Sequence, residues 1–141
     1  MKPALALRIA AVLLAIHLLG HGVGHFTWDK PEDPGMADVV ATMKNYNAKF
    51  MGATKSMADY YNGYSLMMFG VFGMSIFILW ISSNFIYTNE RFAAKILLPI
   101  GITYLLFGII EYISFFPFAA GLSFLSGLLI LFSLYGKHEK Q

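Results

Sequence analysis

Three histidines stand four residues apart in the segment HLLGHGVGHF, at the end of the first apolar stretch of the chain. Because four residues advance an α-helix by about 400°, the side chains of His17, His21 and His25 share one helical face. Imidazole titrates near neutral pH and also binds metal ions. The face is therefore the first candidate for chemistry.

Glu111 is the second candidate for chemistry, because an apolar residue would pack in a hydrophobic stretch at a lower free-energy cost than a glutamate. It lies in LLFGIIEYISFF and is the one charged residue between Ile96 and Gly136. At helical spacing, Tyr104 and Gly108 fall on the same face as Glu111. A histidine and a carboxylic acid side by side can exchange a proton with a bound molecule.

The composition indicates what kind of protein positions these groups. Of the 141 residues, 57% are hydrophobic and 13% are charged, and the mean hydropathy is +0.61, as is typical of integral membrane proteins. The net charge of +2, without a basic patch interleaved with aromatic residues, argues against nucleic-acid binding. The absence of cysteine excludes thiolate metal sites, iron–sulfur clusters and cysteine nucleophiles.

Hydrophobic stretches of about 20 residues predict membrane-spanning helices. We place four of them at residues 4–25, 60–84, 93–115 and 117–135. The chain is thus predicted to be all-α, a single transmembrane domain built as a four-helix bundle over residues 1–141. The very short link around Pro117 makes the last two helices an antiparallel hairpin.

Basic residues near the ends of the spans predict the orientation. Six lie on the side of the termini and four lie in the opposite, outer loop at residues 26–58. By the positive-inside rule, both termini are expected in the cytoplasm, with the chain in a bacterial inner membrane. The six are Lys2, Arg8, Arg91, Lys95, Lys137 and Lys140, and the four are Lys30, Lys44, Lys49 and Lys55.

The outer loop contains an amphipathic pattern. Apolar residues recur at helical spacing over residues 36–51, until Gly52 offers a stop. We expect a surface helix there, with Val40 and Met43 shielded and Asp38 and Lys49 exposed. Its apolar face either rests on lipid or covers the mouth of the bundle.

Several glycines lie at positions where a neighbouring helix could approach closely. Gly20 and Gly24 form a G-x-x-x-G pair beside the histidine face. Gly63, Gly70 and Gly73 are predicted to be contact positions of the second span.

In this topology the ionisable side chains of three helices meet in the outer half of the membrane. The predicted ligand-binding residues are His17, His21, Asp59, Tyr64 and Glu111. Each has a structural alternative: the histidines could be satisfied by carbonyl groups, and Tyr64 could belong to an interfacial aromatic belt. Ser56-x-x-Asp59 matches a helix-capping box.

Part of the chain resembles a known family. The pattern H-x-x-G-H, then M-K/R, then M-G-x-x-x-S-x-x-D-x-x-x-G maps onto His17–His21, Met43–Lys44 and Met51–Gly63. It resembles an uncharacterised bacterial family of small four-span membrane proteins. The resemblance covers about the first half of the chain and implies a topology but no activity.

Three functions fit these residues. A metal ion could be held by His21, His25 and Glu111, although H-L-L-G-H lacks the general base of H-E-x-x-H. A haem would require a homodimer, because every intramembrane histidine lies on one helix. A small apolar ligand could bind, with or without acid–base chemistry on a lipid-like substrate. Alternatively, the chain is an accessory subunit or assembly factor of a larger membrane complex, with the histidines as interhelical contacts.

The predicted orientation can be tested by labelling, because the chain has no cysteine of its own. The single variants Lys44→Cys and Thr88→Cys are expected to react with a membrane-impermeant maleimide from opposite sides of the membrane. Reaction of both variants from the outside of intact cells would overturn the orientation.

Overall fold

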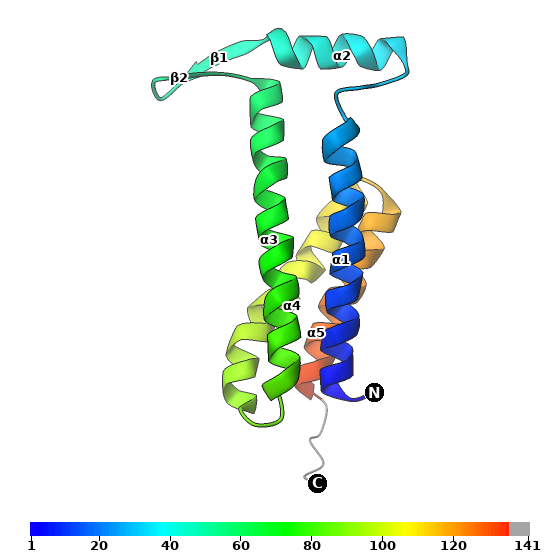
Figure 1. Ribbon diagram of the computed structural model, residues 1–141, viewed down its shortest axis with the longest axis vertical. Helices are drawn as coiled ribbons and strands as arrows, with labels where there is room; N and C mark the ends of the chain where they lie inside the picture. Colours follow the sequence, from blue (N-terminus) through cyan, green and yellow to red (C-terminus); the bar gives the residue numbers. More distant parts are fainter. Residues whose placement is uncertain (136–141) are drawn as a thin grey trace. The chain divides into compact units, whose positions relative to one another are not determined.

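The computed structural model describes residues 1–135 (Figure 1). In this range the helices are α1 (Pro3–Thr27), α2 (Pro34–Asn45), α3 (Met57–Phe85), α4 (Glu90–Ser114) and α5 (Pro117–Tyr135). All but α2 are long and apolar enough to cross a membrane. The prediction of an all-α protein with four membrane-length helices is therefore confirmed. Lys137 and Lys140, used above to predict the orientation, lie outside the described residues.

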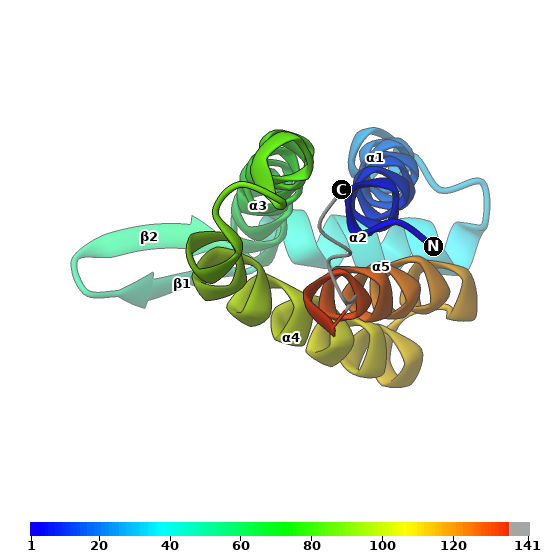
Figure 2. The ribbon, with the colours of Figure 1, turned by 90° about the horizontal axis from the view of Figure 1, so that it is seen from below.

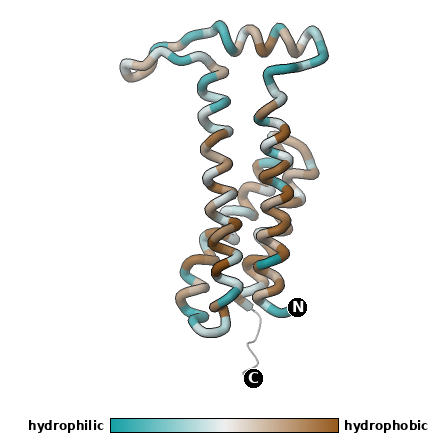
Figure 3. The backbone as a smooth tube through the Cα atoms, viewed as in Figure 1, coloured by the Kyte–Doolittle hydropathy of each residue, from teal (hydrophilic) through white to brown (hydrophobic). Residues whose placement is uncertain are grey.

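The chain divides into two compact units. The first contains residues 1–19 and the described residues from 72 onward, and the second contains residues 20–71. The two long helices α1 and α3 each contribute one part to each unit. Figure 3 shows apolar residues along the long helices and more hydrophilic residues in the segment that joins α1 to α3.

In the first unit, α4 and α5 pack against each other as the predicted antiparallel hairpin, with only Phe115 and Phe116 between them (Figure 2). The two backbones approach closely at glycines. A Cβ atom added to Gly108 would lie 2.6 Å from Cβ of Phe124, and one added to Gly127 would lie 2.8 Å from the backbone nitrogen of Leu105. Only residues without a side chain permit this approach.

The glycines singled out from the sequence do not have this role. A Cβ atom at Gly20, Gly24, Gly63, Gly70 or Gly73 would meet no atom within 4 Å among the described residues. The prediction that they are helix-contact positions is therefore wrong. The glycines at which two helices do approach closely lie in α4 and α5, the pair joined by the shortest link, which keeps the two helices side by side.

The first part of α1 presents a regular buried stripe. Leu7, Ala10, Leu14 and His17 are all buried, at the spacing of three and four residues that one helical face requires. Arg8 lies off this stripe and bonds to the end of α3: its Nε donates to Oγ of Ser83 at 3.1 Å and its Nη2 donates to Oδ1 of Asn84 at 3.2 Å. The guanidinium also lies 5.7 Å from the ring centre of Trp80.

The segment that joins α1 to α3, in the second unit, begins with α2. Asp33 caps this helix by accepting a hydrogen bond from the backbone N–H of Met36, and Pro34 occupies its first turn. Val40 is buried and Asp38 and Lys49 are exposed, as predicted, whereas Met43 is only half-buried. Lys44 Nζ donates to Oδ2 of Asp29 at 3.0 Å, and this hydrogen bond lowers the pKa of the Asp29 carboxyl group.

The predicted surface helix over residues 36–51 is only partly correct. The helix ends at Asn45, and β1 (Asn47–Phe50) and β2 (Ala53–Ser56) follow as an antiparallel hairpin. Met51 and Gly52 form its turn, with φ values of 48° and 83°. Positive φ at both turn residues matches the twist of a two-residue hairpin. The apolar residues at 50 and 51 therefore belong to a strand end and a turn.

The α4–α5 contact can be tested with a matched pair of glycine substitutions. Gly108→Ala is expected to lower the thermal unfolding midpoint in mild detergent by several degrees, because the new methyl group overlaps Phe124 and overpacking costs about 1–3 kcal/mol. Gly73→Ala is expected to leave the midpoint unchanged or higher, because its site is open and alanine favours helix. Equal effects of the two substitutions would contradict the close packing.

Candidate functional site

The candidate site lies in the first unit, where three helices each present one polar side chain. His17 continues the buried stripe of α1, and Ser123 belongs to the buried face of α5. Glu111 follows Leu97, Tyr104 and Gly108 along the buried stripe of α4. The helical repeat therefore brings all three polar groups into the apolar interior of the unit.

The geometry centres on the imidazole of His17. Its Nδ1 lies 3.1 Å from Oγ of Ser123, within hydrogen-bond distance. Its Nε2 lies 3.6 Å from Oε1 of Glu111, which is an ion-pair distance but longer than a hydrogen bond. The side chains of His17 and Glu111 are only 10% and 12% exposed. The predicted approach of Glu111 to His17 is confirmed.

This arrangement requires a proton between histidine and glutamate. Ser123 interacts with the Glu111 carboxyl group as well as with His17. Whichever way the serine hydroxyl points, an unprotonated Nε2 facing an ionised carboxylate would place two lone pairs against each other in a weakly screened interior. Either the imidazole or the carboxyl group therefore carries a proton at this contact.

Two aromatic residues extend the site. The ring of Phe72 lies 4.5 Å from the ring of His17 and 5.9 Å from the ring of Tyr104, measured between ring centres. Tyr104 is 1% exposed. Within the described part of the chain, its hydroxyl group and Oε2 of Glu111 are buried and have no hydrogen-bond partner. Ser75 interacts with the Tyr104 hydroxyl, but no hydrogen bond of normal geometry joins the two.

The other two histidines belong to the second unit and share a different partner. His25 Nδ1 lies 2.8 Å from Oγ of Ser65, while His21 Nε2 lies 3.0 Å from both the hydroxyl and the carbonyl oxygen of Ser65. Both imidazoles also pack edge-on against Phe69. Because a carbonyl oxygen only accepts hydrogen bonds, the contact with the Ser65 carbonyl is a hydrogen bond when His21 carries a proton on Nε2. These contacts tie the end of α1 to α3.

Asp59 adopts the helix-capping alternative. Its carboxylate accepts the backbone N–H of Ser56 at 2.9 Å, and the hydroxyl of Ser56 accepts the backbone N–H of Asp59 at 3.1 Å. This reciprocal pair is a capping box at the start of α3. Tyr64 is 68% exposed, as suits an interfacial aromatic side chain. Ligand-binding roles for Asp59 and Tyr64 stay predictions.

The metal hypothesis finds no matching ligand set. Among residues 1–135, no group of three His, Asp or Glu side chains is arranged to hold a metal ion. His21 and His25 contact Ser65, whereas Glu111 contacts His17. The set of His21, His25 and Glu111 thus stays a prediction without geometric support.

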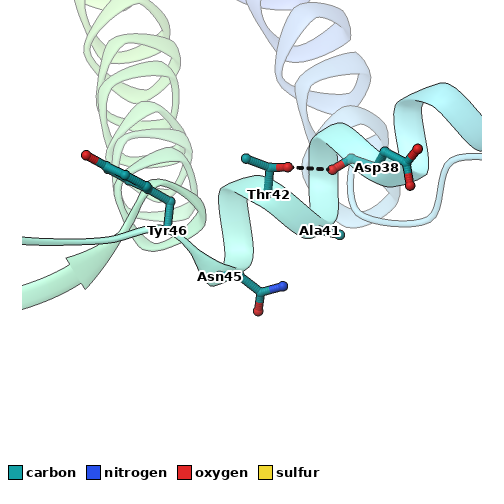
Figure 4. A pocket seen from close by; sticks show the side chains of 5 residues that line it. All are labelled: Asp38, Ala41, Thr42, Asn45 and Tyr46. Atoms are coloured by element: carbon teal, nitrogen blue, oxygen red, sulfur yellow. Dashed lines mark hydrogen bonds between the residues drawn. The ribbon is translucent and has the colours of Figure 1, made fainter.

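A shallow depression on the surface of α2 offers no alternative site. Figure 4 shows its lining residues, of which Asp38 is the one with a charged side chain at neutral pH, and the hydrogen bond from Thr42 Oγ1 to the carbonyl oxygen of Asp38, 2.9 Å long. It is lined by Asp38, Ala41, Thr42, Asn45 and Tyr46.

Sequence reasoning missed the two serines that organise the histidines. Ser65 and Ser123 lie in stretches for which the sequence predicts only hydrophobic membrane spans. The available signal was the residue type, because serines in membrane helices often hydrogen bond to neighbouring helices. Serine is so readily accommodated by its own helix, however, that type alone does not select these two.

Comparison of the chain with family models, with curated proteins and with solved structures finds no match.

The shared role of Ser65 predicts a measurable loss of stability. Ser65→Ala removes the hydroxyl that contacts both His21 and His25, and we expect the free energy of unfolding in detergent to fall by about 1 kcal/mol. Ser126→Ala is the control, since that hydroxyl bonds to the carbonyl of Leu122 in its own helix. Stability of Ser65→Ala equal to that of wild type would show that the two histidines do not depend on the Ser65 hydroxyl.

Proposed function

We propose that this chain is a multi-pass protein of the bacterial inner membrane, with both termini cytoplasmic, that binds a small lipid-soluble molecule at His17 and Glu111. The observation that supports this proposal is the distance of 3.6 Å between His17 Nε2 and Glu111 Oε1, inside an otherwise apolar unit. Even as a pair, such groups are costlier to bury in a membrane than apolar residues, so their presence favours a functional role.

The ligand class follows from the polar atoms that have no hydrogen-bond partner. The Tyr104 hydroxyl is a donor and Oε2 of Glu111 is an acceptor, and both are buried. Buried polar atoms without a partner each cost about 1–3 kcal/mol. A mostly apolar molecule with a hydroxyl group would satisfy both, by accepting from Tyr104 and donating to Glu111. We therefore favour a lipid-like alcohol or phenol.

The chemistry available to a bound hydroxyl is proton exchange. A proton carried by His17 or by Glu111 could pass to the ligand oxygen, or return from it. An intramembrane acid–base enzyme acting on a lipid-like substrate is thus the catalytic form of the same proposal. Metal binding is the less favoured alternative, because the described residues lack a three-ligand group.

An accessory subunit or assembly factor is the second candidate. It is favoured by the contacts of His21 and His25, which use two of the three histidines to join α1 to α3 through Ser65. Histidines with this role are structural hydrogen-bonding groups of the membrane interior. In this case the chain would be isolated together with a larger complex or as a homodimer.

The ligand proposal is tested by native mass spectrometry of protein purified in mild detergent. The wild-type chain is expected to retain a small lipid-soluble molecule. Glu111→Gln keeps the size of the side chain but removes its charge, and we expect retention to fall about tenfold, which corresponds to about 1.4 kcal/mol. Glu90→Gln, at an exposed acid in the first turn of the same helix, is expected to retain as much as wild type.

A second pair of variants separates the hydroxyl from the ring. Tyr104→Phe is expected to weaken retention, whereas Tyr112→Phe, at an exposed tyrosine of the same helix, is expected to have no effect. Equal retention in wild type, Glu111→Gln and Tyr104→Phe would refute the ligand site. Isolation with another membrane protein and no small molecule would favour the accessory subunit, and metal analysis of the same sample tests the metal alternative.

A further inference from the structure

The β1–β2 hairpin has one polar and one mainly apolar face. Its register pairs Ala48 with Lys55, Lys49 with Thr54 and Phe50 with Ala53. Because paired residues point to the same side of a sheet and neighbours along a strand alternate, the two faces can be assigned. One face carries Asn47, Lys49, Thr54 and Ser56, and the other carries Ala48, Phe50, Ala53 and Lys55.

The tip of the hairpin is exposed and hydrophobic. Phe50 is 66% exposed and Met51, in the turn, is 91% exposed. The positive φ values of Met51 and Gly52 make the turn tight, so the tip does not fold back to cover these side chains. Two large apolar side chains at a projecting tip are typical of a surface that contacts lipid or another protein.

Chain connectivity places the hairpin at a membrane surface. Strand β2 ends at Ser56, and α3, one of the membrane-length helices, begins at Met57. Tyr60 and Tyr61 lie in the first turns of α3 and are exposed, as are aromatic side chains at a membrane interface. Figure 1 shows the hairpin projecting sideways from this end of α3, away from α2.

The positive charges of the hairpin favour an anionic lipid headgroup as its partner. Residues 46–56 contain Lys49 and Lys55 and no acidic residue. Lys55 lies on the mainly apolar face beside Ala48, so its aliphatic stem can lie along lipid while its ammonium group reaches a phosphate. A protein partner would not require a lysine on the apolar face.

We propose that the hairpin lies in the interface of the bilayer, with Phe50, Met51 and Ala53 in contact with lipid and Lys55 bound to the phosphate of anionic phospholipids. This site is independent of the ligand site at His17 and Glu111.

Site-directed spin labelling of the full chain tests this proposal, since the sequence contains no cysteine. Ala53→Cys and Thr54→Cys form a matched pair of adjacent positions on opposite faces. The labelled variants are reconstituted in vesicles of phosphatidylcholine, or of equal parts phosphatidylcholine and phosphatidylglycerol. The ratio of collisions with oxygen to collisions with a water-soluble nickel complex is expected to be several-fold higher at Ala53 than at Thr54.

The role of Lys55 is tested in the Ala53→Cys background. The collision ratio is expected to be higher in the vesicles that contain phosphatidylglycerol, and Lys55→Gln is expected to abolish this increase while Lys49→Gln preserves most of it. Equal access of the nickel complex to both labels would overturn the lipid contact. Shielding of the Ala53 label from both reagents would assign the face to a protein partner, and an unchanged increase in Lys55→Gln would overturn the phosphate contact.

Discussion

The cost of placing ionisable side chains in a membrane governs this structure. Glu111 and His17 lie on buried stripes of their helices, where neither can reach bulk water easily. Each therefore needs a polar neighbour inside the protein, and Ser123 supplies one to both. Since the three groups come from α4, α1 and α5, their mutual requirement ties these helices together.

The precision of this contact depends on the packing of α4 against α5. At Gly108 the backbone of α5 passes so closely that even a methyl group would overlap Phe124. Glu111 follows Gly108 by one helical turn, and Ser123 precedes Phe124 by one residue. The closest approach of the two helices therefore lies directly beside the polar cluster, which fixes the height of the carboxyl group relative to the serine hydroxyl.

The sequence predicts those features in which a residue type is costly to place in a membrane, and it does not predict those in which the residue type is accepted in many environments. The four long helices and the pairing of Glu111 with His17 could be predicted, because long apolar runs and buried ionisable groups have few solutions in a membrane. Glycine and serine are accepted in many environments, so the roles of Gly108 and Ser123 were not apparent. The hairpin was missed because Met51 gives no turn signal, although Gly52 does.

The two-residue link between α4 and α5 bears on how the protein enters its membrane during synthesis. Phe115 and Phe116 leave no hydrophilic segment that could stay behind in water while one helix inserts alone. Such a short link favours insertion of the two helices together, as one helical hairpin. Glu111 lies near the linked end of that hairpin, so its carboxyl group enters the lipid with Ser123 already beside it. Insertion in this form would spare the cell the cost of exposing an isolated carboxyl group to hydrocarbon.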